Sequence, residues 1–243
     1  MESVKGEFVT FDVQAPKRQL ELALDVQPQS GRFITFEGGE GTGKSTQIKM
    51  LSSWLQSHQV NNLMTKEPGG TEAGVELRKM LVCGDKDKFD AVAEALLYYA
   101  DRRIHLTTKI WPALQKGTWV LSDRFADSTV AYQYYGYNQK VPYETLQNLY
   151  QIAVGNFKPD LTIVLDLDPK IGIERSFKKA MGMTIKETRF ESMDLSFHQN
   201  LRNGFLQIAA AEPQRCVVLN ADKSIEDLHR DILNVVSERF KLS

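Results

Sequence analysis

The chain has 243 residues, and its 30 Lys and Arg against 31 Asp and Glu leave a formal net charge of -1. This balance lacks the basic excess of a general nucleic-acid-binding protein, so we expect no nucleic-acid partner. No apolar run approaches membrane-spanning length and the first residues lack the apolar core of a signal peptide, so we expect no membrane partner and a cytoplasmic location. The two cysteines, Cys83 and Cys216, show no metal-ligand spacing and are expected to be reduced thiols.

Residues 1–30 differ from the rest of the chain. Their weakly alternating apolar pattern breaks at Pro16, and a short helical pattern ends at Pro28. We interpret 1–30 as an N-terminal extension of unknown role and 31–243 as the functional domain.

A strand, a glycine-rich loop and a helix are predicted in succession from residue 33. Residues 33–36 are apolar and β-prone, and Ile48, Leu51 and Leu55 recur at helical spacing. Between them, residues 38–45 read Gly-x-x-x-x-Gly-Lys-Ser, the phosphate-binding loop motif in the context that it requires.

The residue types of this loop suit the binding of nucleotide phosphates. Glycine lets the backbone turn so that several N–H groups at the helix start face the phosphate oxygens. Lys44 can reach the β- and γ-phosphates of ATP, and the Ser45 hydroxyl can bind Mg²⁺, the expected cofactor. The predicted ATP-binding residues are Gly38, Gly39, Glu40, Gly41, Thr42, Gly43, Lys44, Ser45 and Thr46.

Strand and helix patterns alternate through the rest of the chain. The further strands are expected at 62–65, 119–122, 161–167 and 216–219, and the helices at 71–82, 90–115, 143–154, 169–180, 191–211 and 224–240. Such alternation predicts an α/β fold, a parallel sheet with helices on both faces. Ligands of such folds bind beyond the carboxyl ends of the strands, so the site is expected among 37–43, 66–71, 123–129 and 166–169.

Charged and polar residues follow the strand predicted at 119–122. Asp123 could hold Mg²⁺ through water, and Arg124 could grip a phosphate with two parallel hydrogen bonds, although the two could also be a surface ion pair. The next polar residues suit a heterocycle and a sugar, and are also common at helix starts: Ser128, Thr129, Tyr132 and Gln133.

Two further groups could complete a nucleotide site. Tyr98 and Arg102 share a helix face and could sandwich a base, or could be a core tyrosine and a solvated arginine. The basic segment 174–191, with Arg175 and Arg189, suits a mobile lid that neutralises a transferring phosphoryl group, or a solvated helix face.

Taken in order, these segments resemble the bacterial thymidylate kinases. The resemblance spans roughly residues 32–240 and rests on Phe36–Thr46, Thr65–Thr71, Tyr98–Arg102, Asp123–Gln133, Phe157–Thr162, Leu165–Leu167 and Arg189–Glu191. It implies a P-loop NTPase-type five-stranded sheet with a lid, and transfer of the γ-phosphoryl group of ATP to dTMP, giving ADP and dTDP for dTTP synthesis. It also implies a homodimer, to which Tyr99 and the 90–115 helix could contribute.

The resemblance also assigns roles to individual residues. Lys44, Arg124 and Asp123 would be catalytic, and Ser45 and Asp123 would lie near Mg²⁺. Because residue 41 is glycine and not arginine, a lid residue such as Arg175, Lys179 or Arg189 would supply positive charge. The dTMP-binding residues would be Glu40 at the 3′-hydroxyl, Tyr98 stacked on thymine, Arg102 on a base oxygen, Arg124 on the phosphate, Ser128 and Thr129 at the base edge, Tyr132 under the sugar, and Gln133.

Two alternatives stay open at this point. One is a kinase for another nucleoside monophosphate or for a nucleoside, because the thymine assignment rests on resemblance alone. The other is a non-catalytic nucleotide-binding module, which the joint presence of Lys44, Asp123 and Arg124 disfavours. A GTPase switch is less favoured, because no Asn-Lys-x-Asp motif occurs.

Overall fold

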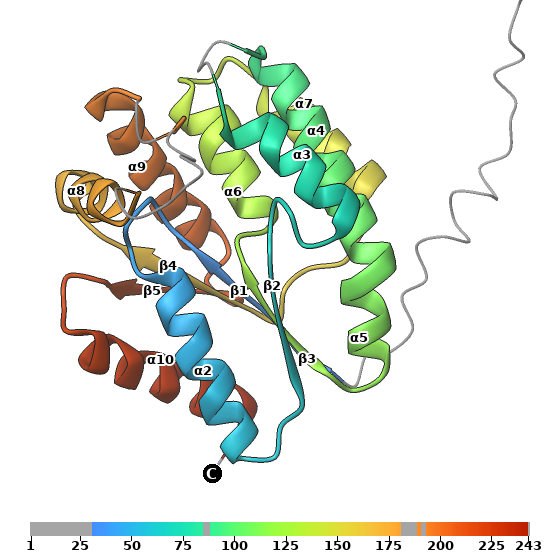
Figure 1. Ribbon diagram of the computed structural model, residues 1–243, viewed down its shortest axis with the longest axis vertical. Helices are drawn as coiled ribbons and strands as arrows, with labels where there is room; N and C mark the ends of the chain where they lie inside the picture. The colour runs from blue at the N-terminus through green and yellow to red at the C-terminus, as the bar shows by residue number, and fades with distance from the viewer. Residues whose placement is uncertain (1–30, 85–87, 181–188, 191–192, 243) are drawn as a thin grey trace, which may run out of the picture.

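A computed structural model describes residues 31–84, 88–180, 189–190 and 193–242 (Figure 1). Its five strands form one parallel sheet in the order β2-β3-β1-β4-β5, which confirms the predicted α/β fold. The strands are β1 (Phe33–Glu37), β2 (Asn62–Lys66), β3 (Trp119–Asp123), β4 (Leu161–Asp166) and β5 (Cys216–Asn220). The predicted extension 1–30 and residues 181–188 and 191 of the predicted lid lie outside the described residues.

Helices cover both faces of the sheet (Figure 1). Side chains alternate across β1, so Ile34 and Phe36 pack toward α2 (Lys44–Ser57) and α10 (Ile225–Phe240), while Phe33 packs toward the opposite face. The remaining helices are α3 (Glu72–Val82), α4 (Ala91–His105), α5 (Trp111–Gln115), α6 (Ala126–Val130), α7 (Tyr143–Ala153), α8 (Pro169–Ala180) and α9 (Leu195–Ala211).

The helix predicted over 90–115 is interrupted by a π-helical segment, Leu106–Ile110. Pro112 has no N–H to donate to the carbonyl of residue 108, so the regular α-helical ladder cannot continue there. The N–H of Trp111 instead reaches the carbonyl of Leu106, five residues back. The predicted helical path is therefore confirmed, with a π-helical segment in its middle.

A helical stretch that the sequence patterns did not predict follows β3. It consists of α6 and a π-helical segment, Ala131–Gly136, and it carries the polar residues that were expected after Arg124. The helix predicted over 191–211 begins only at Leu195, where the carboxylate of Asp194 accepts a hydrogen bond from the Phe197 N–H.

The start of α10 and the two cysteines agree with the sequence-based expectations. The Ser224 hydroxyl caps α10 by accepting a hydrogen bond from the Asp227 N–H at 3.1 Å, as predicted. Cys83 and Cys216 are both free thiols. Among the described helices, none is both long enough and apolar enough to cross a bilayer.

Candidate active site

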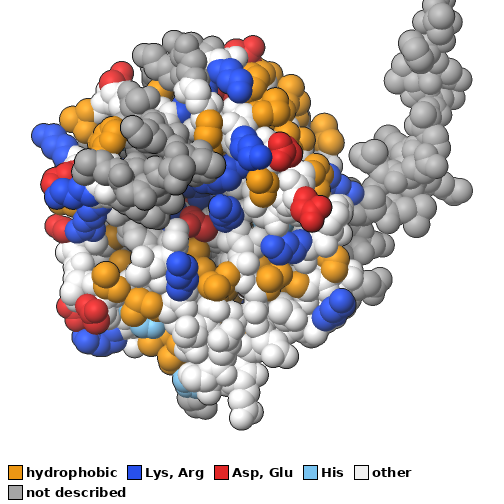
Figure 2. Space-filling model, viewed as in Figure 1, with side chains coloured by type: hydrophobic (Ala, Val, Ile, Leu, Met, Phe, Trp, Pro, Cys, Tyr) orange, Lys and Arg blue, Asp and Glu red, His pale blue; other side chains and the backbone are white. Residues whose placement is uncertain are grey.

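A cavity of about 500 Å³ opens at the carboxyl ends of the strands. It brings together the loop after β1, the loop after β2 and the start of the segment after β3, three of the four predicted strand ends. The fourth, residues 166–169, lines a smaller cavity of about 20 Å³ behind the phosphate loop. Figure 2 shows several Lys and Arg side chains in the middle of this face and others toward its edges. The basic residues that line the cavity are Lys44, Lys66, Arg78, Arg102, Arg124 and Arg175. The larger cavity is thus suited to an anionic ligand.

The phosphate loop needs glycine at positions where its backbone is left-handed. Gly41 has φ +68°, and a Cβ there would lie 2.0 Å from the carbonyl oxygen of Gly172 in α8. In return, a Cβ on Gly172 would lie 2.4 Å from the carbonyl oxygen of Glu40. The loop therefore lies directly against the backbone of α8, and both glycines are required by this close approach.

The Lys44 ammonium lies inside the loop that precedes it. Its Nζ donates hydrogen bonds to the carbonyl oxygens of Gly39 at 2.7 Å and Gly38 at 3.0 Å. Burial is the main reason that the Lys44 pKa falls to about 8, and the nearby charge of Arg124 acts in the same direction. A phosphate in the cavity would favour the charged ammonium.

Oxygen ligands for a metal meet at the start of α2. The Ser45 hydroxyl donates a hydrogen bond to Oδ2 of Asp123 at 2.7 Å, so a hydroxyl and a carboxylate share one corner of the cavity. Within the described residues no cluster of three or more His, Cys, Asp or Glu forms a metal cage. Mg²⁺ commonly uses one or two protein oxygens together with water and substrate phosphates, and this pair fits that pattern.

Arg124 is held at the opening by several contacts. Its backbone has φ +73°, and its Nη1 donates hydrogen bonds to the Gly38 carbonyl at 2.9 Å and the Ser128 hydroxyl at 3.0 Å. Its Nη2 donates to Oε1 of Glu40 at 3.3 Å, and its guanidinium lies 5.0 Å from the centre of the Tyr132 ring. The guanidinium is therefore fixed before any ligand enters.

Glu40 keeps its negative charge in this buried setting. Burial alone would raise the pKa of the carboxyl, but hydrogen bonding with His198, the charge of Arg124 and the Tyr132 hydroxyl together lower it to about 2. Tyr132 donates its hydroxyl to Oε1 of Glu40, and Nδ1 of His198 lies 3.5 Å from Oε2. His198, on α9, is a part of the site that the sequence patterns did not indicate.

Arg102 lies on the other side of the cavity and is buried, not solvated. Its Nε donates to Oε2 of Glu67 at 2.8 Å, and its Nη2 donates to the Thr129 hydroxyl and the Phe125 carbonyl, both at 3.0 Å. No hydrogen-bond partner for its Nη1 is found in the described structure. Tyr98, one turn earlier on α4, is half-buried and also lines the cavity.

Most of the predicted site residues line the larger cavity. These are Glu40, Gly41, Thr42, Gly43, Lys44, Ser45, Thr46, Tyr98, Arg102, Asp123, Arg124, Ser128, Thr129, Tyr132 and Arg175. Gly38 and Gly39 line the smaller cavity behind the loop. The Lys179 side chain lies outside the described structure. The cavity lining also includes Lys66, Arg78 and Phe190, for which no role had been predicted.

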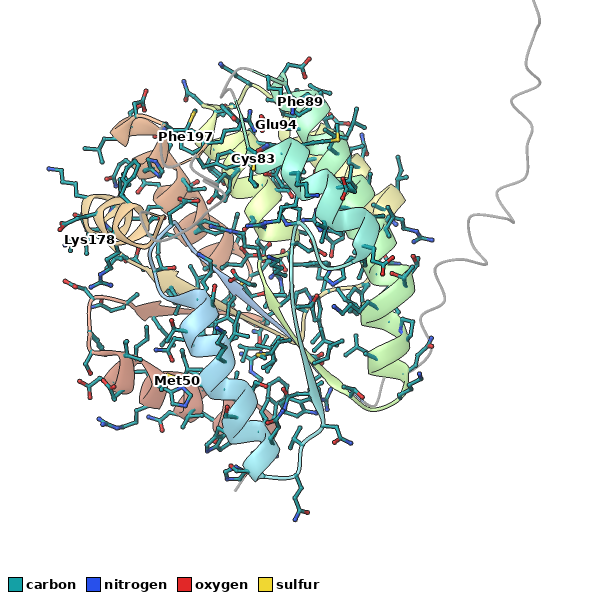
Figure 3. All side chains as sticks on the ribbon, in the orientation of Figure 1. Met50, Cys83, Phe89, Glu94, Lys178 and Phe197 are labelled. Atoms are coloured by element: carbon teal, nitrogen blue, oxygen red, sulfur yellow. The ribbon has the colours of Figure 1, made fainter. Side chains whose placement is uncertain are left out.

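Gln133 and Arg189 are not brought to the cavity. Both pair with Glu94, a buried carboxylate of α4: Gln133 Nε2 donates to Oε2 at 2.7 Å, and Arg189 Nη2 donates to Oε1. Arg189 Nη1 also donates to the Leu81 carbonyl at 2.8 Å. Figure 3 shows Glu94 at the same end of the molecule as Cys83 and Phe197. In this structure both side chains are therefore held by the buried carboxylate, and their predicted roles in catalysis and dTMP binding stay predictions.

We expect Arg189→Met to be strongly destabilising, because it would leave the Glu94 carboxylate buried without its guanidinium. Removing one partner of a buried ion pair costs roughly 3–5 kcal/mol. Chemical denaturation should show this loss, whereas Arg230→Met, which removes an exposed surface pair, should change stability by less than about 0.5 kcal/mol. Equal stability of the two variants would contradict the structural role of Arg189.

Glu37, like Glu94, is a buried carboxylate for which the sequence predicted no role. It ends β1, accepts hydrogen bonds from the Phe125 N–H at 2.8 Å and the Ser128 hydroxyl at 2.5 Å, and is fully buried. Burial, with a further contribution from the charge of Asp127, raises its pKa from 4.5 to about 8. The signal in the sequence was a charged residue at the end of an apolar strand.

Glu37→Gln should remove part of the pH dependence of stability. The folded protein holds the Glu37 proton more tightly than the unfolded chain, so the contribution of this group to stability is fully present below pH 4.5 and is lost as the pH rises through about 8. Glutamine does not titrate, so the fall in melting temperature across this range should be smaller in the variant. An unchanged slope would contradict the raised pKa.

The parallel sheet, the phosphate loop and the cationic cavity beside it define a P-loop nucleotide-binding protein of the α/β class. Residues 36–232 match the family model described as thymidylate kinase. The chain is 48% identical over 213 residues to a thymidylate kinase of Magnetococcus marinus, covering 88% of this chain and 99% of the relative. It is 44% identical over 221 residues to a thymidylate kinase of Bradyrhizobium sp. (strain ORS 278), covering 90% of this chain and 96% of the relative.

A solved structure agrees with these sequence relatives. The crystal structure of thymidylate kinase from Ehrlichia chaffeensis superposes with a TM-score of 0.67 at 30% identity, covering 86% of this chain and 99% of that one. The chain belongs to the thymidylate kinase family.

Proposed function

We propose that this protein transfers the γ-phosphoryl group of ATP to the phosphate of dTMP, forming ADP and dTDP for dTTP synthesis in the cytoplasm. The observation that carries the proposal is one cavity shared by a phosphate loop, a fixed Arg124 and a buried Arg102. The phosphate loop suits the phosphates of the donor, and Arg124 suits the phosphate of the acceptor. Arg102 suits the base of the acceptor. Family membership over residues 36–232 supports the same reaction.

The donor side is formed by residues 38–46. Backbone N–H groups of the loop and the Lys44 ammonium would bind the ATP phosphates. Ser45 and Asp123, joined by their 2.7 Å hydrogen bond, would hold Mg²⁺ directly or through water. When bound, the ion neutralises charge on the β- and γ-phosphates.

The acceptor side is formed by Arg124, Glu40 and the residues near Arg102. Arg124 would grip the dTMP phosphate, and Glu40 with Tyr132 would border the deoxyribose. Tyr98 would stack on thymine, while Arg102 would donate a hydrogen bond to a base oxygen near Ser128 and Thr129.

Catalysis would depend on alignment and charge neutralisation. The attacking phosphate oxygen is already anionic, so little base catalysis is needed. Lys44 and Arg124 would neutralise the donor and acceptor phosphates from two sides. Among the described residues of the predicted lid, Arg175 is a basic residue that lines the cavity. Its guanidinium is directed to Asp222, which is not part of the cavity lining, at 3.5 Å. It would supply the additional cation that the loop, with Gly41, does not provide.

A coupled ADP-release assay tests the function directly. We expect efficient transfer to dTMP, weaker transfer to deoxyuridine monophosphate, and little transfer to deoxycytidine or adenosine monophosphate or to thymidine. Preference for another acceptor would overturn the base assignment, and ATP binding without transfer to any acceptor would overturn the kinase assignment.

A homodimer is the second part of the proposal. The expected contribution of Tyr99 was wrong, because this side chain is 3% exposed and packs in its own core. On the same helix, Val92 is 44% exposed and Leu96 is 51% exposed, which leaves an apolar strip on α4. Sedimentation should give the mass of two chains, and Leu96→Asp should shift it toward one chain.

A further inference from the structure

Behind Arg102 lies a continuous chain of polar contacts that no step of the proposed reaction uses. The carboxylate of Glu67 accepts from Arg102 Nε at 2.8 Å through one oxygen, and pairs with Nδ1 of His105 at 3.0 Å through the other. Nε2 of His105 lies 2.7 Å from the Thr65 hydroxyl. The chain runs from β2 through the loop after it to α4, and it ends on the side chain assigned to the base.

This chain is sealed from solvent at its centre. Glu67, Arg102 and His105 are all buried, and Arg102 is among the largest fully buried side chains of the described core. The loop also fixes the imidazole sterically, because a Cβ on Gly70 would lie 2.3 Å from its Nε2. A buried carboxylate with both oxygens engaged holds its partners in one geometry.

Such an arrangement sets the direction of the guanidinium. Nε is tied to Glu67 and Nη2 to Thr129, so the plane of the group is fixed at two points. Nη1, without a protein partner in the described structure, is the remaining donor. A guanidinium has no acceptor, so in a fixed position it favours a base with a carbonyl and disfavours one with an amino group.

We propose that Glu67 and His105 are positioning residues for base selection, acting through Arg102, with Thr65 fixing the imidazole. This inference rests on the proposed role of Arg102 in binding the base. It makes the selectivity between a carbonyl-bearing and an amino-bearing pyrimidine depend on the residues that hold Arg102 as well as on Arg102 itself.

The experiment uses Glu67→Gln, His105→Leu and Thr65→Val in the full chain, with thymidine and deoxycytidine monophosphates as acceptors. His105→Leu should raise KM for dTMP about ten-fold or more and reduce the preference for dTMP by a similar factor, as expected for loss of a buried hydrogen bond to a charged group. Glu67→Gln should have at least this effect and Thr65→Val a smaller one, while KM for ATP stays within about two-fold. Thr65→Val keeps the test available if the buried variants fail to fold.

A control separates positioning from loss of stability. Ile110→Ala removes a buried side chain on the same helical path, outside the polar chain, and should lower the melting temperature without changing acceptor preference. If it changes the preference as much as His105→Leu does, the proposal is overturned.

A double-substitution cycle tests whether His105 acts through Arg102. In an Arg102→Met background, His105→Leu should cause no further loss of preference, because the group that it positions is absent. Additive losses would overturn the proposal. An Arg102→Met enzyme with normal dTMP preference would overturn the base assignment itself, whereas an effect of Arg102→Met with none of His105→Leu would overturn only this inference.

Discussion

Lys44→Ala is expected to abolish phosphoryl transfer with the fold intact. The Lys44 ammonium is the positive charge held inside the phosphate loop, bonded to the carbonyl oxygens of Gly38 and Gly39. Losing a charge that stabilises the transferring phosphoryl group costs on the order of 10³-fold or more in rate. Single-turnover ADP formation at saturating dTMP measures this loss.

Two observations make that result specific. The circular dichroism spectrum should match that of the wild type, because a buried ammonium contributes little net stability in the empty loop. Lys49→Ala, at an exposed position on the same helix, should retain full activity. Near-normal turnover in Lys44→Ala would refute the assignment of the phosphate loop.

Arg124→Ala should mainly damage use of the acceptor. Arg124 carries the guanidinium between the loop and Glu40, and a cationic group at such a position is worth roughly 10³–10⁵-fold in phosphoryl-transfer rate. We expect kcat/KM for dTMP to fall by about 10³-fold. ATP binding, measured by calorimetry, should change by less than about ten-fold, or about 1.4 kcal/mol.

Arg124→Lys is the matched variant for this position. It keeps the charge but cannot make two parallel hydrogen bonds, so its activity should lie between those of the wild type and Arg124→Ala. A loss confined to ATP affinity in Arg124→Ala would show that the guanidinium serves the donor and not the acceptor.

The fold could be predicted largely because its signals are local. The apolar run of β4 and the helical periodicity of α2 each reflect burial against neighbouring elements. The alternation of strands and helices along the chain then implies a parallel sheet. The π-helical segment at Leu106–Ile110 was missed because its cause, Pro112, lies beyond it in the chain. The helix after β3 was missed because polar residues at its start stand in place of an apolar stripe.

Site residues could be predicted from the sequence where they lie directly after a predicted strand. Residues 40–46 come shortly after β1 and Arg124 comes directly after β3, and all of them line the cavity. The pairing of Gln133 and Arg189 with Glu94 could not be predicted, because Glu94 lies far away in sequence on α4. His198 was not predicted for the same reason, and Glu67, although it lies in the predicted segment 66–71, was given no role, since a buried contact between distant segments leaves no spacing pattern in the sequence.

The backbone contact between Gly41 and Gly172 restricts the routes by which this enzyme could be altered, in the laboratory or by descent. A side chain at 41 would collide with α8, and one at 172 would collide with the loop, so neither position can change alone. An arginine introduced directly after Glu40 would therefore require α8 to move, together with the Arg175 that α8 carries toward the cavity. If Arg175 supplies a cation to the phosphates as proposed, an arginine at position 41 and Arg175 in its present place exclude each other. A variant library that samples position 41 without repositioning α8 should yield only glycine.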